Sequence, residues 1–320
     1  MLPANQKPMQ QKMRLTRYLV KKIIMTDFVF IDSGIGGIPY MMKLLARKPD
    51  SSCVYVADTA NFPYGEKTHA QVIECVTELV EKIRQKFSPK VIVVACNTMS
   101  VNALEALRAK FTDIQFVGTV PAIKLAASVS KKRRIGLLAT KATCENAYNI
   151  ELKNKFASDC TIVNRADPEL ISFIEHNAFT ASREECLEAV KPAVDFFRSE
   201  DCDAMILGCT HFLNFTEVFE EACQPDIKVV DSVDGVVRHA LEVLGPVRRG
   251  QPSIARLCAF CRRILKRPAA AARFLTDFRL ERGSTSPFLY ITGFRDTLEE
   301  NQYNVLCSRF GIQFGGLLSK

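Results

Sequence analysis

Two cysteines of the chain stand in matched sequence settings. Cys96 follows the apolar run Val91–Ala95, and Cys209 follows the apolar run Ala204–Gly208. In both places two polar residues come next, followed by a stretch with helical periodicity. A helix N-terminus lowers the pKa of a thiol and so favours the reactive thiolate. A free cysteine is usually a small buried hydrophobic residue, but the matched settings favour a functional role for both.

A pair of such thiols is suited to one kind of chemistry. If two similar halves of the chain pack about a pseudo-two-fold axis, the thiols face each other across one cleft. That arrangement fits a reaction that needs a base on each side of a single carbon atom. Racemisation is such a reaction, because one group removes the α-proton and the other delivers a proton to the opposite face.

Further candidate residues follow other apolar runs. The glycine-rich stretch Asp32–Gly37 allows the backbone to approach an anion at a helix N-terminus. Pro39 occupies the third glycine position of a dinucleotide fingerprint, so a substrate carboxylate fits there as well as a phosphate. Asp58 ends another apolar run, and the turn Pro63–Gly65 follows it. His211 lies beside the second of the two cysteines, which makes it a candidate acid or base.

Alternating strands and helices must position these residues. Helical periodicity marks Val72–Phe87 and Leu187–Phe197, and helices are also expected at Ser100–Phe111 and Phe212–Ala222. Eight short apolar runs are typical of parallel strands that are buried on both faces. These runs are Phe28–Asp32, Cys53–Asp58, Val91–Cys96, Phe116–Val120, Ile135–Thr140, Thr161–Ala166, Ala204–Cys209 and Ile227–Asp231. The alternation predicts an α/β fold with mainly parallel sheets.

The strand positions also indicate an internal repeat. The last four runs begin 107, 108, 113 and 111 residues after the first four. A repeat of this length predicts two similar halves, in which Cys96 and Cys209 occupy equivalent positions. Both cysteines follow the carboxyl ends of strands, where open parallel sheets bind their ligands.

Composition places the chain among ordinary globular proteins. It has 320 residues, of which 48% are hydrophobic and 24% charged. No apolar run approaches the roughly 18 residues of a membrane span, and Lys21 and Lys22 interrupt the only apolar stretch near the N-terminus. We therefore expect a cytoplasmic protein with no membrane partner, whose 12 cysteines are reduced thiols.

The net charge of +8 resides at the two ends of the chain. Residues 1–24 hold 6 basic and no acidic residues, and residues 246–320 hold 13 basic and 5 acidic ones. The segment 25–245 carries 24 basic and 30 acidic residues, so a nucleic-acid partner is not expected. We expect residues 1–24 to be a disordered basic extension. Cys258 and Cys261 have no second ligand pair at zinc spacing, so no metal site is expected.

Five motifs together resemble those of the glutamate racemases, cofactor-independent enzymes that supply D-glutamate for bacterial peptidoglycan. The motifs are Asp32–Gly37, Pro63–Gly65, Ala95–Thr98, Gly118–Ala122 and Gly208–His211. The likeness runs from about Met25 to Leu244 and resumes at Phe288–Gly293, which resembles the last strand of the family. Aspartate racemases usually lack a histidine after the second Cys-Thr pair, so His211 favours glutamate.

The resemblance implies a fold of two pseudo-symmetric, three-layer α/β domains with the active site in the cleft between them. The first domain would comprise residues 25–121 and 228–320, with a basic insertion at 246–287. The second would comprise residues 122–227. Some relatives with N-terminal extensions are activated by a cell-wall precursor, and a homodimer is a further partner that the resemblance leaves open.

The resemblance also implies roles for individual residues. Cys96 would handle the α-proton of D-glutamate and Cys209 that of L-glutamate, assisted by Asp32, His211 and Glu175. No cofactor or metal is implied. The family often has a cysteine where this chain has Asp167, but that cysteine is not one of the catalytic pair. Substrate contacts map to Asp32, Ser33, Tyr64, Gly65, Asn97, Thr98, Thr143, Thr210 and His211.

Three other functions stay open from the sequence. A racemase of the same superfamily that acts on aspartate or hydantoins would share both thiols. A thiol hydrolase could use Cys209 as nucleophile and His211 as base, although it leaves Cys96 and the repeat unexplained. A nucleic-acid-binding or regulatory protein could use the basic ends.

Overall fold

The computed structural model of the chain describes residues 26–178, 180–245, 287–294 and 297–318. The expected basic extension at 1–24, the pair Cys258 and Cys261, and all but the last residue of the expected insertion at 246–287 lie outside the described residues.

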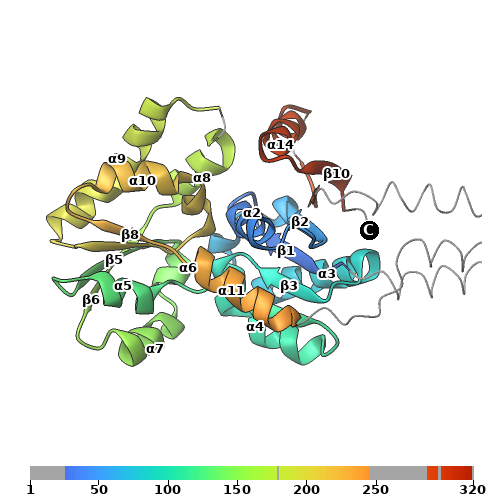
Figure 1. Ribbon diagram of the computed structural model, residues 1–320, viewed down its shortest axis with the longest axis horizontal. Helices are drawn as coiled ribbons and strands as arrows, with labels where there is room; N and C mark the ends of the chain where they lie inside the picture. Colours follow the sequence, from blue (N-terminus) through green and yellow to red (C-terminus); the bar gives the residue numbers. More distant parts are fainter. Residues whose placement is uncertain (1–25, 179, 246–286, 295–296, 319–320) are drawn as a thin grey trace, which may run out of the picture.

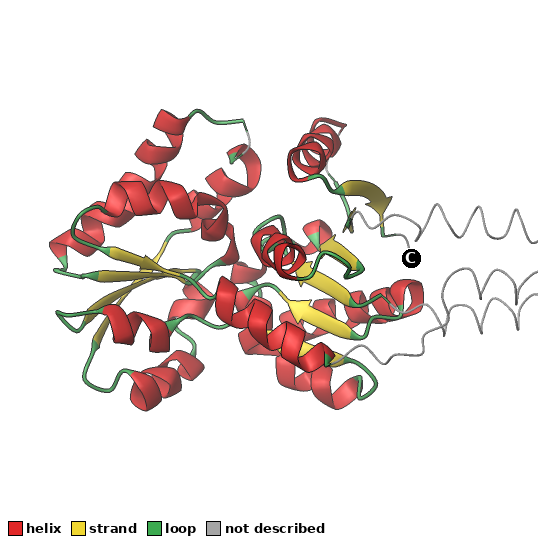
Figure 2. Cartoon of the chain, viewed as in Figure 1, coloured by secondary structure: helices red, strands yellow, loops and turns green. Residues whose placement is uncertain are grey.

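Two parallel sheets organise the described part of the chain (Figures 1 and 2). The six-stranded sheet has the order β10 (Gln313–Leu317), β9 (Phe288–Ile291), β2 (Cys53–Ala57), β1 (Phe28–Asp32), β3 (Val91–Val94), β4 (Gln115–Gly118). The four-stranded sheet has the order β6 (Thr161–Ala166), β5 (Arg134–Ala139), β7 (Ala204–Leu207), β8 (Lys228–Val230). Every strand pair in both sheets is parallel, which confirms the predicted α/β class.

The two sheets share one topology. The order β2-β1-β3-β4 in the first sheet corresponds to β6-β5-β7-β8 in the second, and these are the strands that the sequence repeat pairs. All eight predicted strands are present, with ends that differ from the predicted ones by no more than two residues. In each sheet the strand order reverses between the first and third strands of the repeat. Parallel sheets bind their ligands beyond the carboxyl ends at such a switch point.

Helices cover both faces of both sheets. They are α2 (Ile38–Arg47), α3 (His69–Phe87), α4 (Asn97–Lys110), α5 (Ile123–Val129), α6 (Lys141–Cys144), α7 (Ala147–Phe156), α8 (Pro168–Asn177), α9 (Arg183–Ser199), α10 (Thr216–Cys223), α11 (Val233–Leu244) and α14 (Thr297–Phe310). Three 3₁₀ helices, η1 (Thr59–Asn61), η2 (Tyr64–Glu66) and η3 (Thr210–Phe215), complete the connections. Among the described residues, no helix is long and apolar enough to cross a membrane.

Local sequence fixes where the site-bearing helices begin. Cys96 is the N-cap residue of α4, directly after β3. Asp167 caps α8 by accepting a hydrogen bond from the backbone N–H of Leu170, and Pro168 occupies the first helical position. Both features are typical helix starts. They set the register of α8, and Glu175 therefore lies near its carboxyl end.

The segment after Cys209 differs from its prediction. We expected an α-helix at Phe212–Ala222, as after Cys96, but the thiol is followed by the six-residue 3₁₀ helix η3, and α10 begins only at Thr216. Phe212 and Phe215 are both buried, and a 3₁₀ helix places residues three apart on the same side. Cys209 therefore lacks the α-helix N-terminus that Cys96 has.

The predicted return to the first domain can be located on the strands. The domain division stays a prediction, but its return point at residue 228 falls on β8, which pairs with β7 of the second sheet. The chain leaves that sheet only after Val230, through α11, which packs against α2.

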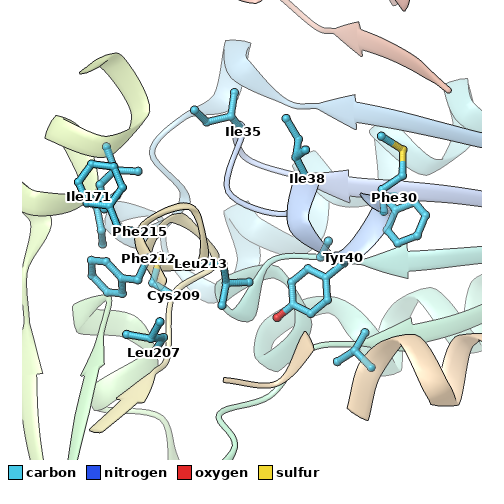
Figure 3. Packing of buried hydrophobic residues seen from close by; sticks show 14 of the residues in the cluster. Phe30, Ile35, Ile38, Tyr40, Ile171, Leu207, Cys209, Phe212, Leu213 and Phe215 are labelled. Carbon is cyan, nitrogen blue, oxygen red and sulfur yellow. The ribbon is translucent and has the colours of Figure 1, made fainter. Parts of the chain in front are cut away.

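One apolar cluster joins the two halves. It contains Phe30 and Tyr40 of the first half and Leu207 and Phe215 of the second (Figure 3). Two further clusters fill the outer layers, one between the first sheet and helices α3 and α4, the other between the second sheet and helices α5 and α7. The carboxyl ends of the strands are thus held against each other by a shared core.

Candidate active site

A cavity of about 1110 Å³ lies where the carboxyl ends of the two sheets meet. Ten of the twelve residues predicted for the site line it: Ser33, Tyr64, Gly65, Cys96, Asn97, Thr98, Glu175, Cys209, Thr210 and His211. Asp32 and Thr143 are buried directly behind the lining, although neither forms part of it. The sequence-distant motifs therefore form one site.

Polar side chains cross between the halves at this cavity. The Nδ2 amide of Asn97 donates to the carbonyl oxygen of Gly208 at 2.8 Å. The Thr210 hydroxyl donates to Oδ2 of Asp32 at 3.1 Å. Because these bonds link residues that flank the two cysteines, they fix the position of one thiol environment relative to the other.

Cys96 shares its surroundings with a buried carboxyl group. The Asp32 carboxylate accepts hydrogen bonds from the backbone N–H groups of Ser33 and Gly37, both at 2.7 Å, and lies within hydrogen-bonding reach of the Cys96 thiol. Burial raises the pKa of Asp32 to about 6, against the opposing effect of His211. Burial, followed by the charge of Asp32, raises the pKa of Cys96 well above its ordinary value, while the backbone N–H of Met99 opposes this. At neutral pH Cys96 is a thiol beside a carboxylate.

Cys209 belongs to a chain of three polar groups. Its sulfur lies 3.6 Å from Nδ1 of His211, whose Nε2 lies 2.7 Å from Oε2 of Glu175. Burial lowers the pKa of His211, but hydrogen bonds to Cys209 and Glu175, together with their negative charges, outweigh burial and hold the pKa well above its usual value. A protonated imidazole stabilises a thiolate at Cys209 through its charge and its hydrogen bond. The same Glu175 oxygen accepts from the backbone N–H of Ile35 at 3.1 Å, which anchors the carboxylate.

The two thiols therefore have different partners. Cys96 lies beside the Asp32 carboxyl group, and Cys209 lies beside the His211 imidazole. Two thiols that each adjoin an acid–base group at the same cavity can carry out acid–base chemistry on a carbon atom that lies between them.

Several lining groups can hold a charged substrate. The Oδ1 atom of Asn97 is buried and has no hydrogen-bond partner, so it is available to accept from a substrate N–H group. Lys67 and Lys141 also line the cavity and provide positive charge for carboxylates. The Thr143 hydroxyl instead accepts a hydrogen bond from Thr140 at 3.0 Å. Thr143 therefore supports the lining from behind.

Sequence reasoning missed further residues of this site, among them three that contact predicted ones. Thr140 directly follows β5 and lies 107 residues after Ser33, which directly follows β1, and the Thr140 hydroxyl lies 3.1 Å from that of Thr98. The repeat offset alone could have identified it. Tyr55 donates to Oδ2 of Asp32 at 3.3 Å, and the Phe62 ring lies 5.8 Å from the His211 ring. Neither aromatic residue carries a signal in the sequence, because each looks like an ordinary apolar residue of a strand or loop.

Within the described ranges, no group of three or more histidine, cysteine, aspartate or glutamate side chains could hold a metal ion.

Comparisons with known proteins place the chain among racemases. Residues 41–240 match the Asp/Glu/Hydantoin racemase family. Glutamate racemase of Treponema pallidum is 36% identical over 292 residues, which cover 91% of this chain and 96% of the relative. Glutamate racemase of Proteus mirabilis is 37% identical over 214 residues, 67% of this chain and 74% of the relative.

Solved structures agree with these matches. Escherichia coli glutamate racemase, in complex with L-glutamate and the activator UDP-MurNAc-Ala, superimposes with a TM-score of 0.72 at 26% identity, covering 92% of this chain and 98% of that one. Glutamate racemase isoform RacE1 of Bacillus anthracis gives a TM-score of 0.64 at 21% identity, covering 92% and 97% of the two chains, and thus shares the fold.

Proposed function

The chain belongs to the Asp/Glu/hydantoin racemase family and is an amino-acid racemase, and we propose that it interconverts L- and D-glutamate by a two-thiol, two-base mechanism. The observation that carries the mechanism is the pairing at one cavity. Cys96 adjoins Asp32, whereas Cys209 adjoins His211 and Glu175.

In the direction from L- to D-glutamate, the Cys209 thiolate removes the α-proton. The electron pair left on the α-carbon delocalises into the substrate carboxylate, and the Cys96 thiol delivers its own proton to the opposite face. The cycle leaves Cys209 as a thiol and Cys96 as a thiolate. His211 and Asp32 then exchange protons with their thiols and with solvent to restore the starting state.

In the reverse direction the roles exchange. Asp32 accepts the Cys96 proton, and the resulting thiolate removes the α-proton of D-glutamate. Cys209, protonated through His211, completes the transfer. Because the two thiols and their partners account for both proton transfers, we propose that the reaction needs no cofactor or metal. Dialysis against a chelator and a carbonyl-trapping reagent should leave the activity intact, and activity that returned only with metal or pyridoxal phosphate would contradict this.

The relatives support a proposal for the physiological role. We propose that the D-glutamate is made in the cytoplasm for peptidoglycan synthesis. The Escherichia coli structure contains UDP-MurNAc-Ala as activator, so a cell-wall precursor is our candidate effector for this chain also. Assays with and without UDP-MurNAc-Ala test the second proposal. A homodimer is tested by measuring the mass of the protein in solution.

Racemisation in heavy water tests the mechanism. Circular dichroism or chiral chromatography should show interconversion of purified L- and D-glutamate without additions. From the first turnover the product should carry solvent deuterium at the α-carbon, while unreacted substrate keeps hydrogen. Cys96→Ser and Cys209→Ser should each reduce turnover by several powers of ten, because a hydroxyl is far less acidic than a thiol.

Other outcomes would separate the alternatives. Near-normal turnover in either serine variant, or intact passage of the substrate hydrogen into product, contradicts two-base catalysis. Preference for aspartate or a hydantoin would contradict glutamate as substrate. A covalent acyl-enzyme at Cys209, seen by mass spectrometry, would indicate a thiol hydrolase, since Cys209, His211 and Glu175 also have the order of a hydrolase triad.

A further inference from the structure

Asp58 is a buried carboxylate that lies beside the cavity. The proposed mechanism does not use this carboxylate. It follows β2 and is 1% exposed. Its Oδ2 atom accepts hydrogen bonds from the Tyr64 hydroxyl and, at 3.0 Å, from the Asn61 side chain. Its Oδ1 atom accepts from the Thr292 hydroxyl at 2.7 Å. One carboxylate thus binds its own loop, Asn61–Tyr64, and a second segment at Thr292, which lies 234 residues after Asp58 in the sequence.

The second of these segments, Thr292 and Gly293, directly follows β9. The Thr292 hydroxyl also accepts from the backbone N–H of Ala60 at 3.0 Å, and the Thr292 N–H donates to the carbonyl of Ala57 at 3.1 Å. Thr59 and Gly293 bond to each other in both directions through the Thr59 hydroxyl. The chain after β9 is therefore fixed to the chain after β2 by side-chain and backbone bonds together.

Both segments then enter the cavity wall. Tyr64 and Gly65 line one part of it, and Gly293, Phe294 and Tyr303 line another. Burial and the Asp58 charge raise the pKa of Tyr64, so its phenol stays protonated and continues to donate to Asp58. A hydrogen bond to a charged acceptor is worth more than a neutral one, so the carboxylate dominates this junction.

We propose that Asp58 is a positioning residue for substrate: it joins the Tyr64–Gly65 loop to Thr292 and so holds Gly293 and Phe294 in place, and this junction sets the affinity for glutamate. The inference rests on the proposed function. Gly293 and Phe294 thereby become part of the substrate site, although they follow the two half-chains of the repeat. Asp58 itself touches neither thiol in this arrangement and moves no proton.

Thr292→Val tests the junction with little change in side-chain shape, and Thr292→Ser is the matched control that keeps the hydroxyl. In Thr292→Val and in Asp58→Asn, we expect KM for both enantiomers of glutamate to rise about tenfold. We expect kcat to stay within about twofold and the pH dependence of kcat to stay unchanged. Thr292→Ser should resemble the parent protein.

Amide hydrogen exchange provides a readout that does not need catalysis. In Thr292→Val, amides of residues 59–65 should exchange faster than in the parent, and in Thr292→Ser they should not. Unchanged KM in both Asp58→Asn and Thr292→Val, or unchanged exchange at 59–65, would overturn the proposal. So would a shifted pH profile of kcat in Asp58→Asn, which would assign Asp58 to proton transfer. If the parent protein fails to racemise glutamate, the proposed function fails, while the exchange result still decides whether the junction exists.

Discussion

Burial of Asp32 disfavours the ionised carboxylate that its proposed role requires. Its carboxyl group is fully buried, and burial alone would keep it protonated. The charge of His211 and the hydrogen bond from the backbone N–H of Ser33 lower the pKa against burial, and the Gly37 N–H and the Tyr55 and Thr210 hydroxyls also donate to the carboxylate. The resulting pKa of about 6 allows Asp32 to hold or release a proton near neutral pH, as a proton acceptor for Cys96 must.

This pKa predicts a pH dependence that differs between the two directions. Below about pH 6 Asp32 holds its own proton and cannot accept the one from Cys96, so kcat from D- to L-glutamate should fall as the pH decreases through about 6. The opposite direction starts with Cys96 as a thiol, so its kcat should lack this acidic limb. Initial rates from pH 5 to pH 8 measure both. Since the equilibrium ratio of the enantiomers is one, kcat/KM must stay equal in the two directions. KM from D- to L-glutamate must therefore fall together with kcat, relative to the opposite direction.

Asp32→Asn is the control for that profile. It should lower turnover, chiefly from D- to L-glutamate, and it should abolish the limb near pH 6. An identical limb in the variant would assign the titration to another group. His211→Asn should act chiefly in the other direction and move the Asp32 limb to higher pH, because it removes the charge that lowers the pKa of Asp32.

The sequence predicts some residues of the site and misses others, and each omission has a physical reason. Cys96 and Cys209 could be found because each follows a strand, and strands repeat along the chain. Glu175 comes from the carboxyl end of α8, where no local pattern distinguishes it from a solvated helix residue. Only the resemblance pointed to it. Tyr55 lies inside β2, and its hydrogen bond to Asp32 depends on the pairing of β1 with β2.

Among the elements, the connection between β1 and α2 lies very close to the second half. A Cβ atom at Gly36 would lie 2.6 Å from the backbone nitrogen of His211. A Cβ atom at Gly34 would lie 2.4 Å from Oε2 of Glu175. These glycines let the Asp32–Gly37 connection pack against η3 and α8 without displacing the residues around Cys209.

Gly36→Ala should therefore separate the connection from η3. We expect turnover to fall at least about tenfold, because displacement of His211 by a fraction of an ångström weakens its bond to Cys209. Gly235→Ala is the matched control, since nothing lies within 4 Å of a Cβ atom there and the residue is inside α11. It should preserve turnover and stabilise the protein by about 0.5–1 kcal/mol. Steady-state rates and urea denaturation measure both effects, and full activity in Gly36→Ala would contradict the close approach.

The sequence predicted which segments form strands and helices better than it predicted their geometry. Apolar runs predicted eight strands because parallel strands are buried on both faces. The strand β10 was not predicted, since Gln313–Leu317 contains two glycines and only half-buried or exposed side chains. It is held by backbone pairing with β9, with a register shift between Phe314 and Gly316. The 3₁₀ form of η3 was missed because it depends on where Phe212 and Phe215 are buried.

For the whole molecule, the shared core bears on the predicted division into two domains. Residues 25–121 with the returning C-terminal segment, and residues 122 to about 230, each build a sheet, yet one cluster contains Phe30 and Met205 together. Leu213 of η3 also belongs to this cluster (Figure 3). A common core makes the burial of each half depend on the other. We therefore expect the two halves to unfold together.

Two buried cysteines provide reporters for that prediction. Cys53 lies in β2 of the first sheet, and Cys160 precedes β6 of the second. In increasing urea, mass spectrometry should show thiol labelling at both sites with the same midpoint. Leu213→Ala should lower both midpoints together, since loss of a buried leucine side chain costs about 2–5 kcal/mol. If Cys160 became reactive at lower urea than Cys53, or if Leu213→Ala shifted only one midpoint, the halves would be independent folding units. The cavity between them would then depend on docking of the two halves and not on a continuous core.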